Sequence, residues 1–142
     1  MSVDVKYTAH GFATGGRAGA GASDDGRIAV TLSVPKELGG DSGPGTNPEQ
    51  MFAIGYSACF LGALKFVAGK ESVKLPETTK VSAAIGIGPR ADGGGFGITA
   101  ALTISAPEVE RARLEDLVQK AHIVCPYSNA ITKTVDVQLT VA

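Results

Sequence analysis

Apolar and polar residues alternate along several short stretches of this chain, and such alternation is typical of a β-strand with one buried face. Segments containing Gly or Pro separate these stretches, as expected for turns. The alternation predicts strands, the second of them loosely specified, at residues 3–9, 14–22, 27–34, 81–88, 96–105 and 134–141.

A long helix is predicted over residues 48–68. Asn47 is a favourable cap, Pro48 suits the first helical position, and Glu49 lies near the positive end of the helix dipole. Thr46 and Glu49 also fit a capping box, which leaves the start of the helix open by about one residue.

The same helix is apolar on all sides. Only Ser57 and Lys65 interrupt the apolar pattern of residues 51–68, and Gly69 is expected to end the helix. A helix of this kind is expected to be buried. A membrane span is a competing interpretation, which is less favoured because a span needs about 20 apolar residues and this run is shorter.

A second, amphipathic helix is predicted over residues 108–122, and Pro126 limits its extension. Its apolar stripe consists of Val109, Leu114, Leu117, Val118 and Ala121. Strands and helices are segregated along the chain, which predicts an α+β fold. With 142 residues, the chain is expected to form a single domain over residues 1–142.

Composition narrows the function classes. The chain is 44% hydrophobic and 19% charged, and its formal net charge of −1 argues against a nucleic-acid partner, which would require a basic surface. The first ten residues lack the basic and apolar segments of a secretory signal. We therefore expect a cytoplasmic protein, in a compartment that keeps thiols reduced.

The chain has two cysteines, and they are its only redox-capable side chains. Cys59 lies inside the long apolar helix, and Cys125 follows the second helix. A cysteine attacks as its thiolate, which a neighbouring cation favours. Because no cation lies close to Cys59 on its own helix face, Arg17 in a Gly-rich segment is the candidate, with Glu49 as the carboxylate that its guanidinium would bridge.

The segments around the two cysteines, residues 46–63 and 121–130, together resemble the organic hydroperoxide resistance (Ohr) proteins of the OsmC-like family. The resemblance extends over the whole chain, including residues 16–19. It implies an OsmC-like α+β fold with antiparallel sheets packed around a long buried central helix. It also implies that Cys59 attacks the peroxide, that Cys125 resolves the product, and that Arg17 and Glu49 are their polar partners.

The function implied by the resemblance is a thiol-dependent peroxidase that answers organic peroxide stress. Cys59 would reduce an organic hydroperoxide to an alcohol and become a sulfenic acid, and Cys125 would then form a disulfide with it. A lipoylated protein or another dithiol would reduce that disulfide. No cofactor is implied, whether metal, haem or flavin.

An apolar approach to Cys59 would favour alkyl and fatty-acyl hydroperoxides over hydrogen peroxide, by about 0.8 kcal/mol for each buried methylene. The side chains expected to line that approach, and so to bind substrate, are Met51, Phe52, Phe60, Phe96 and Ile123.

The spacing of Glu49 and Cys59 raises a question of assembly. Ten positions along one straight helix separate them by about 15 Å, so they cannot share a site within it. Either the helix begins later, or two copies pack antiparallel about an axis near residue 54, where Gly55 permits close approach. We therefore predict an intertwined homodimer with composite sites.

Three other interpretations use the same residues. His122 and Cys125, with His10 and Cys59, could bind structural zinc, although their spacing matches no zinc finger or ribbon, and His122 better fits a cation in the last turn of a helix. A carrier of apolar ligands would use the helix-lined cavity without catalysis. Osmotically induced proteins of the wider OsmC-like family share the thiol pair, but residues 47–50 and 124–129 favour the Ohr branch.

Overall fold

The computed structural model describes residues 2–142. These residues divide into two compact units, and the boundary along the chain lies between Pro48 and Glu49. In chain order the elements are β1 (Gly11–Thr14), η1 (Gly16–Ala18), β2 (Ala20–Ser23), β3 (Ala29–Thr31), η2 (Lys36–Leu38), α1 (Pro48–Lys70), β4 (Lys80–Pro89), β5 (Phe96–Ser105), α2 (Arg111–Val124), α3 (Pro126–Ile131) and β6 (Val137–Val141). The prediction of a single domain over residues 1–142 stays a prediction.

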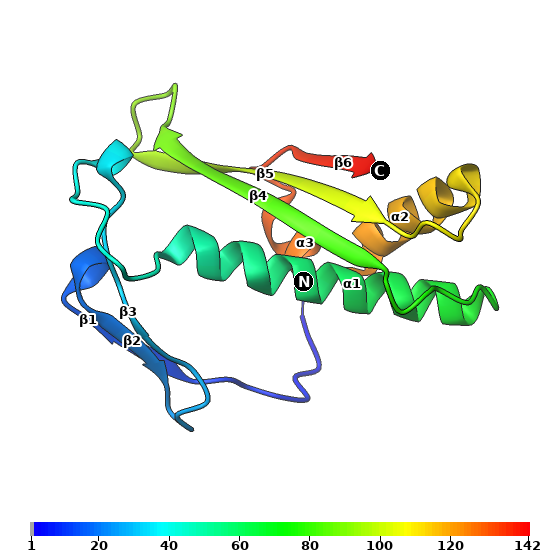
Figure 1. The fold of residues 1–142 in the computed structure, drawn as a ribbon, viewed down its shortest axis with the longest axis horizontal. Helices are drawn as coiled ribbons and strands as arrows, with labels where there is room; N and C mark the ends of the chain where they lie inside the picture. Colours follow the sequence, from blue (N-terminus) through cyan, green and yellow to red (C-terminus); the bar gives the residue numbers. More distant parts are fainter. Residues whose placement is uncertain (1) are drawn as a thin grey trace. The chain divides into compact units, whose positions relative to one another are not determined.

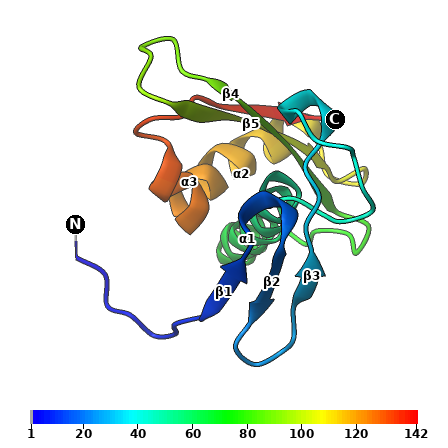
Figure 2. The same ribbon diagram turned by 90° about the vertical axis from the view of Figure 1, so that its left-hand side faces the viewer.

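The N-terminal unit contains a three-stranded antiparallel sheet in the order β1-β2-β3 (Figure 2). Its first two strands are joined through η1, where Gly15 and Gly16 have φ of 71° and 59°. This left-handed backbone disfavours side chains, which explains the glycines of this turn.

Two strand predictions in this unit need correction. Residues 3–9 form no strand, and their apolar side chains Val3, Val5 and Tyr7 are 66–80% exposed. Alternation predicts a strand only where a neighbouring strand and a core are available, and this segment has neither. The segment 14–22 is also not one strand, because η1 interrupts it and divides β1 from β2.

The C-terminal unit packs α1, α2 and α3 beneath a sheet with strand order β4-β5-β6 (Figure 1). β4 and β5 form an antiparallel hairpin, with Lys80 opposite Ser105 and Pro89 opposite Phe96. β6 runs parallel to β5, so the prediction of antiparallel sheets is wrong for this edge. After β5 the chain crosses over through two helices and re-enters the sheet in the same direction, which a parallel pair requires.

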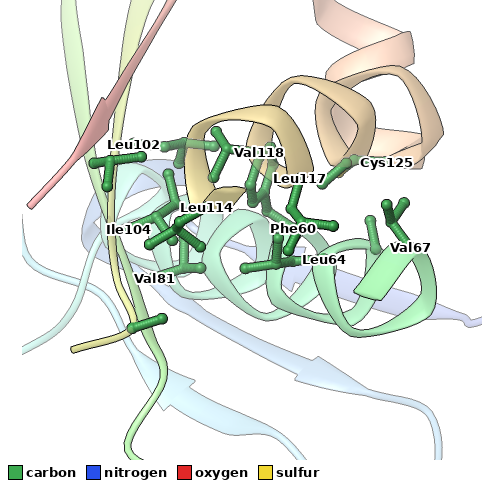
Figure 3. Close-up of a cluster of buried hydrophobic side chains, with 14 of the residues drawn as sticks. Phe60, Leu64, Val67, Val81, Leu102, Ile104, Leu114, Leu117, Val118 and Cys125 are labelled. Carbon is green, nitrogen blue, oxygen red and sulfur yellow. The ribbon is translucent and has the colours of Figure 1, made fainter. Parts of the chain in front are cut away.

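The core of this unit lies between the sheet and the helices (Figure 3). Its fully buried large aliphatic side chains are Leu64 of α1, Leu102 and Ile104 of β5, and Leu114, Leu117 and Val118 of α2. The apolar stripe predicted for the second helix is confirmed for Leu114, Leu117, Val118 and Ala121, which are all buried. Its fifth residue, Val109, precedes the helix and is only partly buried.

α1 begins where the sequence predicts and continues two residues further, to Lys70. Its burial on all sides is a wrong prediction for the isolated chain. The buried residues lie on one face, at Tyr56, Phe60, Ala63, Leu64, Val67 and Ala68, whereas Ile54 is 72% and Phe66 52% exposed. By length and composition alone α1 could cross a membrane, a test that the core helix of a soluble protein also passes.

The second helix begins later than predicted, at Arg111, because Glu110 caps it. The Glu110 carboxylate accepts hydrogen bonds from the backbone N–H groups of Ala112 and Arg113. It ends at Val124, and the short helix α3 follows from Pro126. The sequence analysis missed α3, because six residues are too few for a helical period to be visible.

Candidate active site

The two cysteines lie in contact, although 66 positions separate them. The Cys125 thiol donates to the Cys59 sulfur across 3.7 Å, and both cysteines are free. Cys125 is fully buried, whereas Cys59 is partly exposed. An incoming molecule therefore reaches Cys59 first, and Cys125 lies behind it.

The position of Cys125 follows from the local sequence. Its N–H donates to the Ala121 carbonyl in the last turn of α2, and its own carbonyl accepts from Asn129 in α3. The extended backbone of Cys125, with ψ of 122°, is what the following Pro126 imposes. The proline thus ends one helix, starts the next, and leaves Cys125 at the junction.

Burial raises the pKa of the Cys59 thiol above its usual range. A hydrogen bond from the Tyr127 backbone N–H lowers it, and the neighbouring Cys125 sulfur raises it again. The net direction disfavours a thiolate at neutral pH. A peroxide-attacking Cys59 consequently needs a cation, as the sequence analysis anticipated.

A largely buried hydrogen-bonded trio of Tyr56, Ser128 and His122 lies beside the thiol pair, and the sequence analysis did not predict it. The Tyr56 hydroxyl is 2.8 Å from the Ser128 Oγ, which is 2.9 Å from Nδ1 of His122. Tyr56 and Ser128 are fully buried. Burial lowers the pKa of His122, so a cation in the last turn of α2 is not the form that this site favours.

The five predicted substrate-binding side chains have different surroundings. Phe52 is partly buried, with its ring 5.7 Å from that of Tyr127 and 5.9 Å from that of Tyr56. Phe60 is fully buried, with its ring 6.5 Å from that of His122. Three are exposed: Met51 at 37%, Ile123 at 79%, and Phe96 at 72% at the hairpin end of β5. A role in binding stays a prediction for all five.

The predicted polar partners lie in different units. Arg17 is part of η1 in the N-terminal unit, and Glu49 is in the first turn of α1. Because α1 is continuous from Pro48, a later start of the helix cannot bring Glu49 to Cys59, and about 15 Å of helix separates them. Their part in the site stays a prediction.

Within residues 2–142, no three His, Cys, Asp or Glu side chains are grouped so that they could hold a metal ion. Of the alternative zinc ligands, Cys59, His122 and Cys125 therefore form no such group in this part of the chain.

Fold and site together define a class: an α+β protein with a partly exposed thiol on a long helix and a wholly buried second thiol in contact with it. Residues 39–140 match the family model described as OsmC-like protein. The chain belongs to the OsmC-like family and groups with its organic hydroperoxide resistance proteins.

Individual relatives agree with this assignment. The chain is 52% identical over 138 residues to the organic hydroperoxide resistance protein of Xanthomonas axonopodis pv. citri, covering 97% of this chain and 96% of the relative. A crystal structure of an organic hydroperoxide resistance protein from Legionella pneumophila matches with a TM-score of 0.91 and 40% identity, covering 98% and 99% of the two chains.

An osmotic stress-induced relative shares the fold alone. The structure from Psychrobacter arcticus matches with a TM-score of 0.71 at 10% identity, over 99% of this chain and 100% of the other. Sequence identity therefore favours the organic hydroperoxide resistance branch over the osmotically induced one.

Proposed function

We propose that this protein is a cysteine-based peroxidase that reduces organic hydroperoxides to alcohols in the response to organic peroxide stress. The observation that carries the proposal is the 3.7 Å contact between the partly exposed Cys59 and the buried Cys125. The names of the relatives support the substrate class.

The chemistry has two steps. The Cys59 thiolate attacks the O–O bond of the hydroperoxide, so that one oxygen bonds to sulfur and the other leaves as an alcohol after taking a proton. Cys125 then attacks the sulfur of the Cys59 sulfenic acid, and its proton leaves with the hydroxyl group as water. The two thiols are oxidised to a disulfide while the hydroperoxide is reduced.

Arg17 would supply the positive charge that favours the Cys59 thiolate, and Glu49 would hold the Arg17 guanidinium. A guanidinium stabilises a thiolate and bonds a carboxylate at the same time. Glu49 lies too far along α1 to act on Cys59 of the same chain, so we propose an intertwined homodimer in which each Glu49 faces the partner's site. The exposed side of α1 supports this assembly, because Ile54, Ala58 and Leu61 line an open groove of ≈ 440 Å³ against β4.

Substrate preference would follow from apolar surface near Cys59. Phe52 packs on the two tyrosines beside the thiols, and exposed Met51 and Ile123 could extend an apolar path. Each methylene buried there would contribute about 0.8 kcal/mol. Long-chain fatty-acyl hydroperoxides should thus react faster than hydrogen peroxide.

We further propose that a lipoyl-type dithiol, carried by a protein, reduces the disulfide by exchange. The proposal places the reaction in the cytoplasm. It needs no metal, haem, flavin or nucleic acid, and no insertion into a membrane.

The direct test compares the consumption of cumene hydroperoxide and hydrogen peroxide, each with dihydrolipoamide or thioredoxin as reductant. We expect the fastest turnover with cumene hydroperoxide and dihydrolipoamide. Equal rates for both peroxides would contradict the apolar preference. No consumption of either would leave the carrier of apolar ligands as the better interpretation.

Two cysteine variants connect the activity to the residues. Cys59→Ser should abolish consumption, because a hydroxyl is too weakly acidic to attack as an anion. Cys125→Ser should instead consume one equivalent and retain a sulfenic acid on Cys59, visible by mass spectrometry. Full turnover by the Cys59 variant would refute the role assignment.

A further inference from the structure

Tyr56, Ser128 and His122 each lie three residues from one of the two cysteines. Tyr56 precedes Cys59 by three residues on α1, so their side chains share a face of the helix. His122 and Ser128 lie three residues before and after Cys125, in the last turn of α2 and the first turn of α3. The hydrogen bonds of the trio therefore join the same segments that carry the two sulfurs.

The directions of these hydrogen bonds follow from burial. The Tyr56 hydroxyl is fully buried, so its hydrogen needs an acceptor, and Ser128 Oγ lies within reach at 2.8 Å. With His122 neutral and protonated on Nε2, Ser128 donates its own hydrogen to Nδ1. Burial also lowers the pKa of His122, which agrees with this arrangement.

Two other hydrogen bonds in the described part of the chain join α1 to the Cys125 junction: the Cys125 thiol donates to the Cys59 sulfur, and so does the Tyr127 N–H. Both end on the Cys59 sulfur, which changes during the reaction, whereas the Tyr56–Ser128 bond ends on neither sulfur. Ser128 contacts both partners at once, whereas Cys125 has backbone bonds to Ala121 and Asn129 and a thiol that donates to the Cys59 sulfur. The separation of Cys125 from Cys59 thus depends on how α2 and α3 are fixed against α1.

We propose that Tyr56, Ser128 and His122 act as positioning residues that hold the Cys125 junction at attacking distance from Cys59, and so set the rate of disulfide formation. This inference rests on the proposed function and adds which residues govern its second step. Tyr56 and Ser128 are fully buried, so neither is expected to touch peroxide or reductant, and the first step should not depend on their hydrogen bond.

The physical basis is orientation. Cys125 must approach from 3.7 Å and attack along the axis of the bond that breaks, and misplacement by about 1 Å can slow such a step about a hundredfold. Without the Tyr56 hydroxyl, Ser128 keeps His122 as its acceptor, but the bond between α3 and α1 is lost. The bond from the Tyr127 N–H to Cys59 and the contact of the Tyr127 and Phe52 rings remain, so the Cys125 junction is held less firmly against Cys59 but is not released.

The test uses one equivalent of 4,4′-dithiodipyridine on the reduced protein, which measures both thiols without peroxide. The Cys59 thiolate attacks the reagent, forming a mixed disulfide and releasing one thiopyridone. Cys125, after losing its proton to water, attacks the Cys59 sulfur, forming the protein disulfide and releasing the second thiopyridone. Wild type should show two phases, and Cys125→Ser only the first.

Tyr56→Phe should slow the second phase about tenfold or more and leave the first phase within about twofold. His122→Leu should have the same effect, whereas His122→Asn, whose amide oxygen replaces Nδ1 as acceptor, should restore most of the rate. Thr79→Val is the matched control, because it removes another hydroxyl hydrogen bond from a buried residue, the one to the Pro76 carbonyl. Both of its phases should equal those of wild type.

Second phases at the wild-type rate in Tyr56→Phe and His122→Leu would overturn the inference. Equal slowing of both phases would also overturn it, because that pattern indicates general distortion of the fold. Failure of the proposed peroxidase function would appear separately, as absent peroxide consumption by a wild-type protein that completes both phases.

Discussion

At the scale of single residues, the two cysteines could be predicted and their hydrogen-bonded neighbours could not. The segments around Cys59 and Cys125 are informative when taken together. The trio depends on Ser128 meeting Tyr56 of α1, which lies 72 positions away. A lone Tyr, Ser or His in a sequence carries no sign of such a partner, because the contact is formed by tertiary packing.

His122 gives a prediction on pH and stability. Its pKa in the folded protein is below the ordinary 6.5, so the unfolded chain binds more protons just below that pH. The free energy of unfolding should therefore fall as the pH decreases from 6.5 through the folded pKa. His122→Asn, which cannot be protonated, should remove this part of the decrease.

The measurement is the urea midpoint as a function of pH, for wild type and His122→Asn. His10→Asn is the control, because His10 is exposed. A wild-type decrease that persists unchanged in His122→Asn would assign the effect to other groups. Loss of the decrease in the urea midpoint in His10→Asn would also contradict the assignment to His122.

At the scale of elements, the helices and strands that have one face against the core were predicted well from the sequence. The hairpin β4–β5 and both long helices follow the alternation and the apolar stripe closely. Failures occur where an element lacks such a face or is short, as for residues 3–9 and α3. The parallel direction of β6 was missed because strand direction depends on the crossover and not on the strand itself.

The buried stripe of α2 gives a prediction on packing. Leu117 is fully buried against α1 and the sheet, so Leu117→Ala should lower the free energy of unfolding by about 2–5 kcal/mol. Gln119→Ala, on the exposed side of the same helix, should change it by less than about 0.5 kcal/mol. Equal effects of the two changes, measured by urea unfolding, would show that this face of α2 is not a core face.

At the scale of the whole molecule, α1 is the element whose apolar pattern is not fully explained by burial within one chain. The sequence predicted burial on all sides, and the single chain buries only one face. The proposed homodimer would account for the discrepancy, because an apolar pattern reflects burial in an assembly as well as burial in a chain. The apolar pattern of α1 does not say which surface covers its exposed face.

The homodimer proposal predicts complementation between two inactive variants. Cys59→Ser and Glu49→Ala chains, unfolded together and refolded, should form heterodimers with one intact site of two. Regained peroxide consumption, at up to half the wild-type rate for each heterodimer, is the expected result. Light scattering that gives a monomer mass, or a mixture that stays inactive, would contradict the composite site.

The complete burial of Cys125 has a consequence for how the protein meets foreign electrophiles. An alkylating compound can reach the partly exposed Cys59 but not the buried thiol of Cys125. Alkylated Cys59 offers no leaving group for Cys125 to displace, so one modification would disable both thiols permanently. The burial that keeps oxidants away from Cys125 thus also means that alkylation of Cys59 alone should be enough to inactivate the thiol pair.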